Sequence, residues 1–200
     1  MLDLVRQQDP TIHALVGFDD WLYPETIELL NNTSNRTQIA ATIWHAEFYT
    51  SWRNGKPEKL PDNTVWFEAV KNSRVAPYSK TQGFTGCFLG LRAEEAGYRK
   101  IHLSKRGEIF FCKLHQAIEC NPLAFWTVED VWAYLLSRKV NYNRSYDKLT
   151  DLGIPLQYQR VGPMAVDKVL GYGQLSHLKR GWPEFYNQFI REFPEASGYS

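Results

Sequence analysis

The chain has 200 residues, of which 44% are hydrophobic and 14% aromatic, which is enough for one sizeable core and too apolar for a disordered chain. Its 23 basic and 22 acidic residues nearly cancel, so the overall charge of +1 gives no reason to expect nucleic-acid binding. No apolar run approaches the roughly 18 residues that cross a bilayer, so we expect no membrane partner. Three cysteines without a C-x-x-C pair suit a reducing cytoplasm, so we expect a cytoplasmic protein. The length favours one domain over residues 1–200.

The first predicted elements alternate between helix and strand. Residues 1–9 have the apolar spacing of a helix, and residues 11–18 form an apolar run of strand length. Residues 24–30 predict a second helix, because proline stands at its first position and Glu25 lies near its positive end. A strand, an acidic loop and a helix in this order form half of a βαβ unit.

The next segments are less regular. Residues 38–49 predict a strand or a short helix, and their β-branched and aromatic content favours the strand. Residues 54–63 hold two prolines and a glycine and predict a loop, whereas residues 64–73 have the spacing of a helix.

The stretch from Gly86 to Arg99, G-C-F-L-G-L-R-A-E-E-A-G-Y-R, is the first candidate site. The apolar residues at the beginning of this stretch predict a buried strand, and Arg92 follows the carboxyl end of that strand. Ligands of open α/β sheets bind outside the carboxyl ends of the strands, where a guanidinium can hold an anion with its planar fork of donors. The alternative is a solvated helix start with an ion pair, and these residues alone favour that alternative.

The C-terminal half begins with two short predicted strands, over residues 107–114 and 116–123. A helix follows within residues 121–140, where Thr127 and Asp130 have the spacing of a capping box. Its predicted apolar stripe consists of Val128, Val131, Trp132, Leu135 and Leu136.

Residues 141–148 predict a polar, tyrosine-rich loop, and residues 152–169 predict irregular structure around Arg160. Arg160 is a second candidate anion ligand. Pro183 marks the first turn of a last helix, which ends before Pro194.

Cys112, His115 and Cys120 have the spacing C-x2-H-x4-C. Structural zinc sites normally assemble four ligands in tighter pairs, so buried structural cysteines beside one histidine are the favoured interpretation. We therefore expect no metal site.

Several motifs, in the right order, resemble the phosphoadenosine phosphosulfate (PAPS) reductase family. The three longest are G-L-R-A-E-E at 90–95, N-P-L-A-F-W-T-V-E-D-V-W-A-Y-L at 121–135 and N-Y-N-R-S-Y-D-K-L at 141–149. The tetrapeptide Y-P-E-T at 23–26 is similar to the end of the family signature L-D-T-G followed by F-P-E-T. The segment R-V-G-P-M-A-V at 160–166 is similar to family members that are frequent in bacteriophages.

This resemblance implies an α/β fold of the adenine nucleotide alpha hydrolase type, with a doubly wound, largely parallel sheet. It implies that ATP or PAPS binds at the strand ends, and that the activity is sulfur transfer or nucleotide activation with a small-molecule nucleotide and a thiol electron donor as partners. The matching arginine loop closes over the anionic groups, so the ligand role of Arg92 becomes the favoured one. The nucleotide-binding residues carried over are Arg92, Glu95, Arg99 and Arg160, with Asp19 and Asp20 as substitutes for most of L-D-T-G.

The chain also departs from the family pattern. The phosphate loop S-G-G-K-D-S is missing, and residues 1–5 match the middle of the helix that follows it, so we expect an N-terminally truncated fold or a loop supplied by another chain. The reductases use a cysteine in a C-terminal E-C-G-L-H motif as nucleophile, whereas no cysteine follows Cys120 here.

Three hypotheses follow from the sequence. The first is an enzyme of the family, which becomes active when a phosphate loop completes it. The second is a non-catalytic remnant or binding module of the same fold. The third is a sulfur-inserting partner in nucleic-acid modification, which fits poorly because relatives of that kind hold an iron-sulfur cluster with several cysteines.

Overall fold

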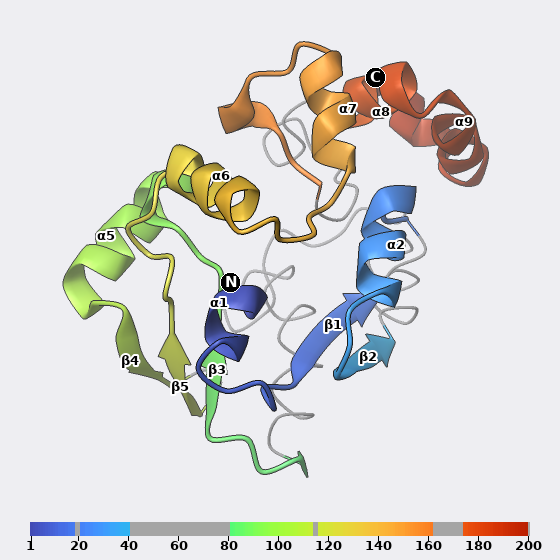
Figure 1. Ribbon diagram of the computed structural model, residues 1–200. Helices are drawn as coiled ribbons and strands as arrows, with labels where there is room; N and C mark the ends of the chain where they lie inside the picture. Colours follow the sequence, from blue (N-terminus) through green and yellow to red (C-terminus); the bar gives the residue numbers. More distant parts are fainter. Residues whose placement is uncertain (19–20, 41–80, 114–115, 162–173, 200) are drawn as a thin grey trace, which may run out of the picture. The chain divides into compact units, whose positions relative to one another are not determined.

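The computed structural model describes residues 1–18, 21–40, 81–113, 116–161 and 174–199 (Figure 1). The loop predicted over 54–63, the helix predicted over 64–73 and most of the strand predicted over 38–49 lie outside the described residues. The chain divides into two compact units, and the single domain over residues 1–200 stays a prediction. Unit 1 comprises Met1–Phe18 and Asn35–Val140, and unit 2 comprises Asp19–Ser34 and Asn141–Ser200.

Unit 1 begins with helix α1 (Leu2–Arg6) and a parallel pair of strands, β1 (Ala14–Phe18) and β2 (Arg36–Ala40). The Arg6 side chain ties these elements together, because it donates hydrogen bonds to the carbonyl oxygens of Ile12 at 3.1 Å and Asn35 at 2.9 Å. The helix and the strand predicted over residues 1–18 are thus confirmed.

A second sheet of unit 1 contains β3 (Gly86–Phe88), β4 (Ile109–Cys112) and β5 (Ala117–Cys120) in the order β3-β5-β4 (Figure 1). Strands β3 and β5 are parallel, with Gly86 opposite Ile118, whereas β4 and β5 are antiparallel, with Phe111 opposite Ile118. The two short strands predicted over 107–123 are confirmed. The α/β class is also confirmed, and among the described strands the second sheet is mixed rather than parallel.

The described part of unit 1 also contains η1 (Ala93–Glu95), α5 (Gly97–Arg106) and α6 (Val128–Ser137). Helix α5 packs against β4, because the ring of His102 and the guanidinium of Arg106 each lie 5.2 Å from the Phe110 ring. The helix ends at Arg106 and is followed by Gly107, whose φ of +77° is a conformation that glycine adopts without strain.

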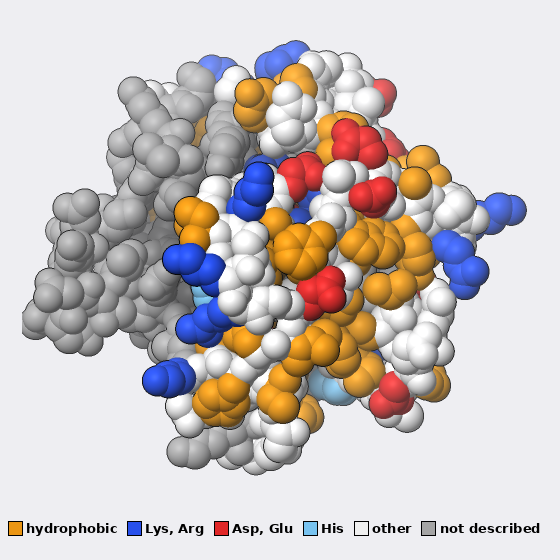
Figure 2. Space-filling view, turned by 90° about the vertical axis from the view of Figure 1, so that its left-hand side faces the viewer, with side chains coloured by type: hydrophobic (Ala, Val, Ile, Leu, Met, Phe, Trp, Pro, Cys, Tyr) orange, Lys and Arg blue, Asp and Glu red, His pale blue; other side chains and the backbone are white. Residues whose placement is uncertain are grey.

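The prediction that β3 is buried was wrong. The strand register places Phe88, Ile109, Phe111 and Ile118 on one face of the sheet, and 40% to 65% of each side chain is exposed. Figure 2 shows hydrophobic side chains gathered on the surface of α5 and β4. An apolar run predicts a strand, but it does not reveal how much of each face other elements cover. For the same reason Leu136, predicted to lie in the apolar stripe of α6, is 62% exposed.

Unit 2 is helical in the described residues. Its elements are α2 (Pro24–Asn31), α7 (Ser145–Asp151), η2 (Leu156–Tyr158), α8 (Gln174–Gly181), α9 (Pro183–Glu192) and η3 (Pro194–Tyr199). Leu149 of α7, Leu178 of α8 and Phe189 of α9 are completely buried and form its core. The Trp21 ring lies 5.1 Å from that of Phe189, edge to face, so an aromatic contact joins the segment before α2 to α9.

The predicted starts of α2 at Pro24 and of α9 at Pro183 are confirmed. The loop predicted over 141–148 was partly wrong, because α7 begins at Ser145. The side chain of Asn143 accepts the backbone N–H of Ser145 at 3.0 Å and so takes up a donor at the start of the helix. Within the described ranges, the structure contains no helix with the length and apolar composition to cross a membrane.

Candidate functional site

The candidate site lies in unit 1, beyond the carboxyl ends of the parallel strands β3 and β5. The Leu89 N–H donates to the carbonyl of Cys120 at 2.9 Å, and the Ala93 N–H donates to that of Ala124 at 2.7 Å. The loop after β3 and the loop after β5 therefore lie side by side. This is the edge at which α/β sheets bind ligands.

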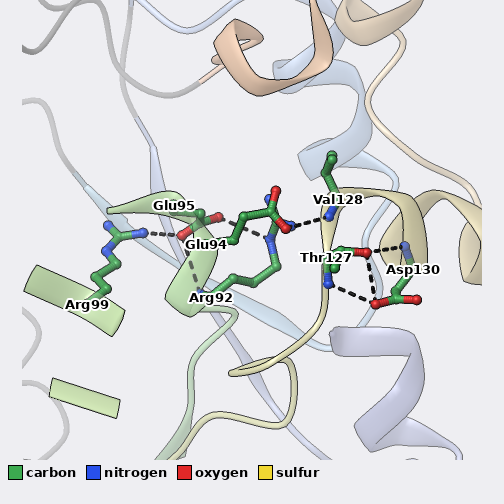
Figure 3. Close-up of polar contacts among 7 residues, drawn as sticks. All are labelled: Arg92, Glu94, Glu95, Arg99, Thr127, Val128 and Asp130. Carbon is green, nitrogen blue, oxygen red and sulfur yellow. Dashed lines mark hydrogen bonds and ion pairs between the residues drawn. The ribbon is translucent and has the colours of Figure 1, made fainter. Parts of the chain in front are cut away.

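Arg92, Glu95 and Arg99, three of the residues predicted for the site, contact one another at this edge (Figure 3). One Glu95 oxygen accepts the backbone N–H of Arg92 at 3.4 Å and also pairs with the Arg99 guanidinium. The other Glu95 oxygen lies 3.4 Å from Nε of Arg92. Glu95 thus fixes both arginines, and only 14% of the Arg92 side chain is exposed.

The same region contains Glu94, which was not among the residues predicted for the site. Its Oε2 accepts the N–H of Val128, the first residue of α6, at 3.0 Å and lies 3.6 Å from Nη1 of Arg92 (Figure 3). A carboxylate at the N-terminus of a helix is favoured by the helix dipole. The E-E doublet next to Arg92 is the only sequence signal for Glu94, and spacing alone does not show which of the two carboxylates reaches α6.

The first turn of α6 carries the capping box that the sequence predicts. The Thr127 N–H donates to Asp130 at 2.9 Å, and the Asp130 N–H donates to the Thr127 hydroxyl oxygen at 3.1 Å. The Thr127 backbone N–H and hydroxyl both donate to the Asp130 carboxylate, and these two bonds lower the pKa of the Asp130 carboxyl from its ordinary value. Asp130 therefore binds within the cap, and Glu94 is the carboxylate that contacts both the first turn of α6 and Arg92.

Buried polar atoms without a hydrogen-bond partner also occur in these two loops. Asn121, the first residue after β5, is completely buried, yet neither polar atom of its side chain has a partner. Nη1 of Arg92 is likewise buried and makes no hydrogen bond, although it is near the charge of Glu94. Such groups are rare in folded proteins and often mark a functional site.

Three further residues were predicted for the site: Arg160, Asp19 and Asp20. Arg160 belongs to unit 2, where its Nη1 donates to the carbonyl of Gln159 at 2.8 Å. Asp19 and Asp20 lie outside the described residues.

Unit 2 has a polar centre of its own around Glu25, in the Y-P-E-T motif. Its carboxylate accepts hydrogen bonds from the Ser145 hydroxyl at 2.9 Å and from the indole N–H of Trp182 at 2.9 Å, and it lies 2.7 Å from Nζ of Lys148. Burial by itself raises the pKa of the Glu25 carboxyl, but these interactions outweigh it and hold the pKa below its ordinary value. From the sequence, Glu25 was predicted only to lie near the positive end of a helix and within the Y-P-E-T motif.

Cys87 and Cys120 show no sign of activation. All three cysteines are free thiols. Burial, with smaller contributions from Glu119 and the other two cysteines, raises the pKa of Cys87 to about 11, and burial also raises that of Cys120. His115 lies outside the described residues, and the parts of the chain that the structure describes hold no cluster of metal-ligating side chains.

Comparison with known proteins gives the same family as the motifs. The family model of the phosphoadenosine phosphosulfate reductase domain matches residues 1–167. Proteins named phosphoadenosine 5'-phosphosulfate reductase are similar at low identity: 25% over 154 residues in Xanthomonas oryzae pv. oryzae and 24% over 155 residues in Yersinia enterocolitica. These alignments cover 74% of this chain and 61% and 60% of the relatives, so the chain spans about three fifths of their length.

Proposed function

Because this chain belongs to the phosphoadenosine phosphosulfate reductase domain family, we propose that it binds an adenine nucleotide, ATP or PAPS, and holds an anionic group of that nucleotide with Arg92. Relatives named for the reduction of PAPS support this choice of ligand. The position of Arg92 supports the choice of residue.

The proposal rests on the burial and the unused hydrogen-bond donor of Arg92, which lies beyond the carboxyl ends of β3 and β5. Its side chain is largely buried and oriented by Glu95, yet Nη1 makes no hydrogen bond. Arginine keeps its charge at every physiological pH and holds phosphate or sulfate oxygens through two parallel donors. A preorganised guanidinium with an unused donor is suited to such an anion. Arg99, fixed by the same Glu95, adds a second positive charge to the loop.

We infer nucleotide binding for this chain and assign no nucleophilic role to Cys87 or Cys120. Attack of a cysteine on the sulfur of PAPS needs a thiolate. The raised pKa values of Cys87 and Cys120 keep these thiols protonated near neutral pH. Sulfur transfer by this chain would therefore depend on a nucleophile other than these two cysteines.

Titration calorimetry with ATP and with PAPS tests the proposal. Arg92→Ala should weaken binding by about 1.5 to 3 kcal/mol, the scale of a charge-assisted hydrogen bond, which is roughly a 10-fold to 150-fold loss of affinity. Arg138→Ala is the matched control, because Arg138 is an exposed arginine at the other end of α6. Absence of heat with either nucleotide at high protein concentration, or equal affinities of the wild type and Arg92→Ala, would contradict the proposal.

A further inference from the structure

We propose that Glu94 is an internal competitor for the anion at this site: its carboxylate occupies the position between Arg92 and the first turn of α6 that a phosphate or sulfate group of the ligand takes on binding. This inference rests on the proposed nucleotide binding and adds the Val128 N–H to the groups that hold the anion.

The geometry shows that this position already receives an anion. One Glu94 oxygen accepts the Val128 N–H at 3.0 Å and lies 3.6 Å from Nη1 of Arg92 (Figure 3). The first distance is a hydrogen bond, whereas the second is a contact between charges only. The carboxylate thus satisfies the helix donor and leaves the arginine donor without a hydrogen bond.

A phosphate or sulfate group is better matched to this pair of donors than a carboxylate on a glutamate side chain. Its three terminal oxygens are arranged tetrahedrally, so one can accept from Val128 while another accepts from Arg92. Charge-assisted hydrogen bonds of this kind are about twice as strong as neutral ones. The ligand therefore gains an interaction that Glu94 does not make.

Glu94 is also the acidic group of this cluster that can leave most easily. Glu95 is held by the backbone of Arg92 and by Arg99, and Asp130 is held by Thr127. Glu94 has 40% of its side chain exposed and makes one hydrogen bond to the backbone, so it can turn into water. While it stays, its negative charge beside Arg92 opposes the entry of a second anion.

The test is the affinity of Glu94→Gln for ATP, measured by calorimetry. Removing the competing charge should tighten ATP binding about 5-fold to 10-fold, and Glu94→Ala should do the same if it keeps the melting temperature of the wild type. Glu129→Gln removes an equal charge from the first turn of the same helix, where the side chain is exposed, and should change affinity less than 2-fold. In the Arg92→Ala background, Glu94→Gln should give no gain, because the group for which it competes is gone.

Unchanged or weaker ATP binding by both folded Glu94 variants overturns the competitor role and leaves the proposed function intact. An equal gain from Glu129→Gln also overturns it, because the effect would then be a general one of charge. Failure of the wild type to bind ATP or PAPS overturns the proposed function itself. The competitor role of Glu94 is then overturned as well, because it rests on that function.

Discussion

Replacement of Glu25 should destabilise unit 2 more than replacement of Glu28, the other charged residue of helix α2. The carboxylate joins three segments, because it contacts Ser145 and Lys148 of α7 and the indole of Trp182, which precedes α9. Only 15% of the Glu25 side chain is exposed. Two variants separate its charge from its hydrogen bonds: Glu25→Ala removes both, whereas Glu25→Gln keeps an accepting oxygen.

The magnitude follows from the groups that Glu25→Ala leaves unpaired. Ser145 is completely buried and Trp182 is 5% exposed, so each loses an acceptor in a place that water does not reach, at about 1 to 3 kcal/mol each. Lys148 is 48% exposed and can hydrate, so the lost ion pair contributes less than about 1 kcal/mol. Together these losses lower the free energy of unfolding by about 3 to 5 kcal/mol. Glu25→Gln should lose about 1 to 2 kcal/mol, because its amide oxygen still accepts one of the bonds.

The lowered pKa of Glu25 adds a dependence on pH. A carboxyl whose pKa is lower in the folded state contributes stability above its unfolded value of about 4.3, and this contribution is lost as the pH falls through the folded pKa. Urea unfolding at pH 7 and near pH 3 measures it. The wild type should lose more stability between the two pH values than Glu25→Gln, and the two proteins should converge in acid.

Glu28→Gln is the matched control, because Glu28 is an exposed glutamate one turn further along α2. The reasoning is refuted if Glu25→Gln and Glu28→Gln unfold at the same urea concentration at pH 7. It is also refuted if the difference between Glu25→Gln and the wild type persists unchanged near pH 3.

Four further predictions concern unit 1. Thr127→Ala should lower the free energy of unfolding by about 1 kcal/mol in urea titrations, because it removes the cap of α6. Asn121→Leu should leave that free energy unchanged or raise it, because an apolar side chain of similar size replaces a buried amide without partners; a large loss would show that the amide is satisfied. Trp132→Ala should cost about 3 kcal/mol, the lower end of the range for a buried aromatic, because Trp132 is only partly buried, and a wild-type melting temperature would contradict this. Cys87, with a pKa of about 11, should react with iodoacetamide at pH 8 about 100-fold more slowly than free cysteine, and its rate, followed by mass spectrometry, should still be rising at pH 10.

Elements with a local signal at their start could be predicted from the sequence. Thr127 and Asp130 predict the start of helix α6, and α2 and α9 begin with proline. Residues within one turn therefore decide where each helix starts. Helix α7 has a weaker local signal, the Asn143 side chain that accepts the Ser145 N–H. It is two turns long, and its stability depends on the complete burial of Leu149 and on the bond from Ser145 to Glu25, which lies 120 positions away in the sequence.

The same distinction applies to the candidate site. Arg92, Glu95 and Arg99 are three to seven positions apart, so a short helical segment brings them together, and the sequence contains that information. Glu94 meets α6 through Val128, 34 positions further along the chain. Only the pairing of β3 with β5 brings these two loops side by side, and that pairing is a property of the fold.

The ion pairs of Arg92 reconcile the two interpretations that the sequence left open. As one of them predicted, a strand ends in an ion pair at a helix start, because Glu95 binds the backbone and Nε of Arg92. This pairing leaves donors of the Arg92 guanidinium available, because a guanidinium has five N–H donors and Nη1 makes no hydrogen bond. It also fixes the side chain before a ligand arrives, which reduces the conformational entropy lost on binding. An arginine held in this way is a better anion ligand than a solvated one, so the structural ion pair supports the proposed binding role.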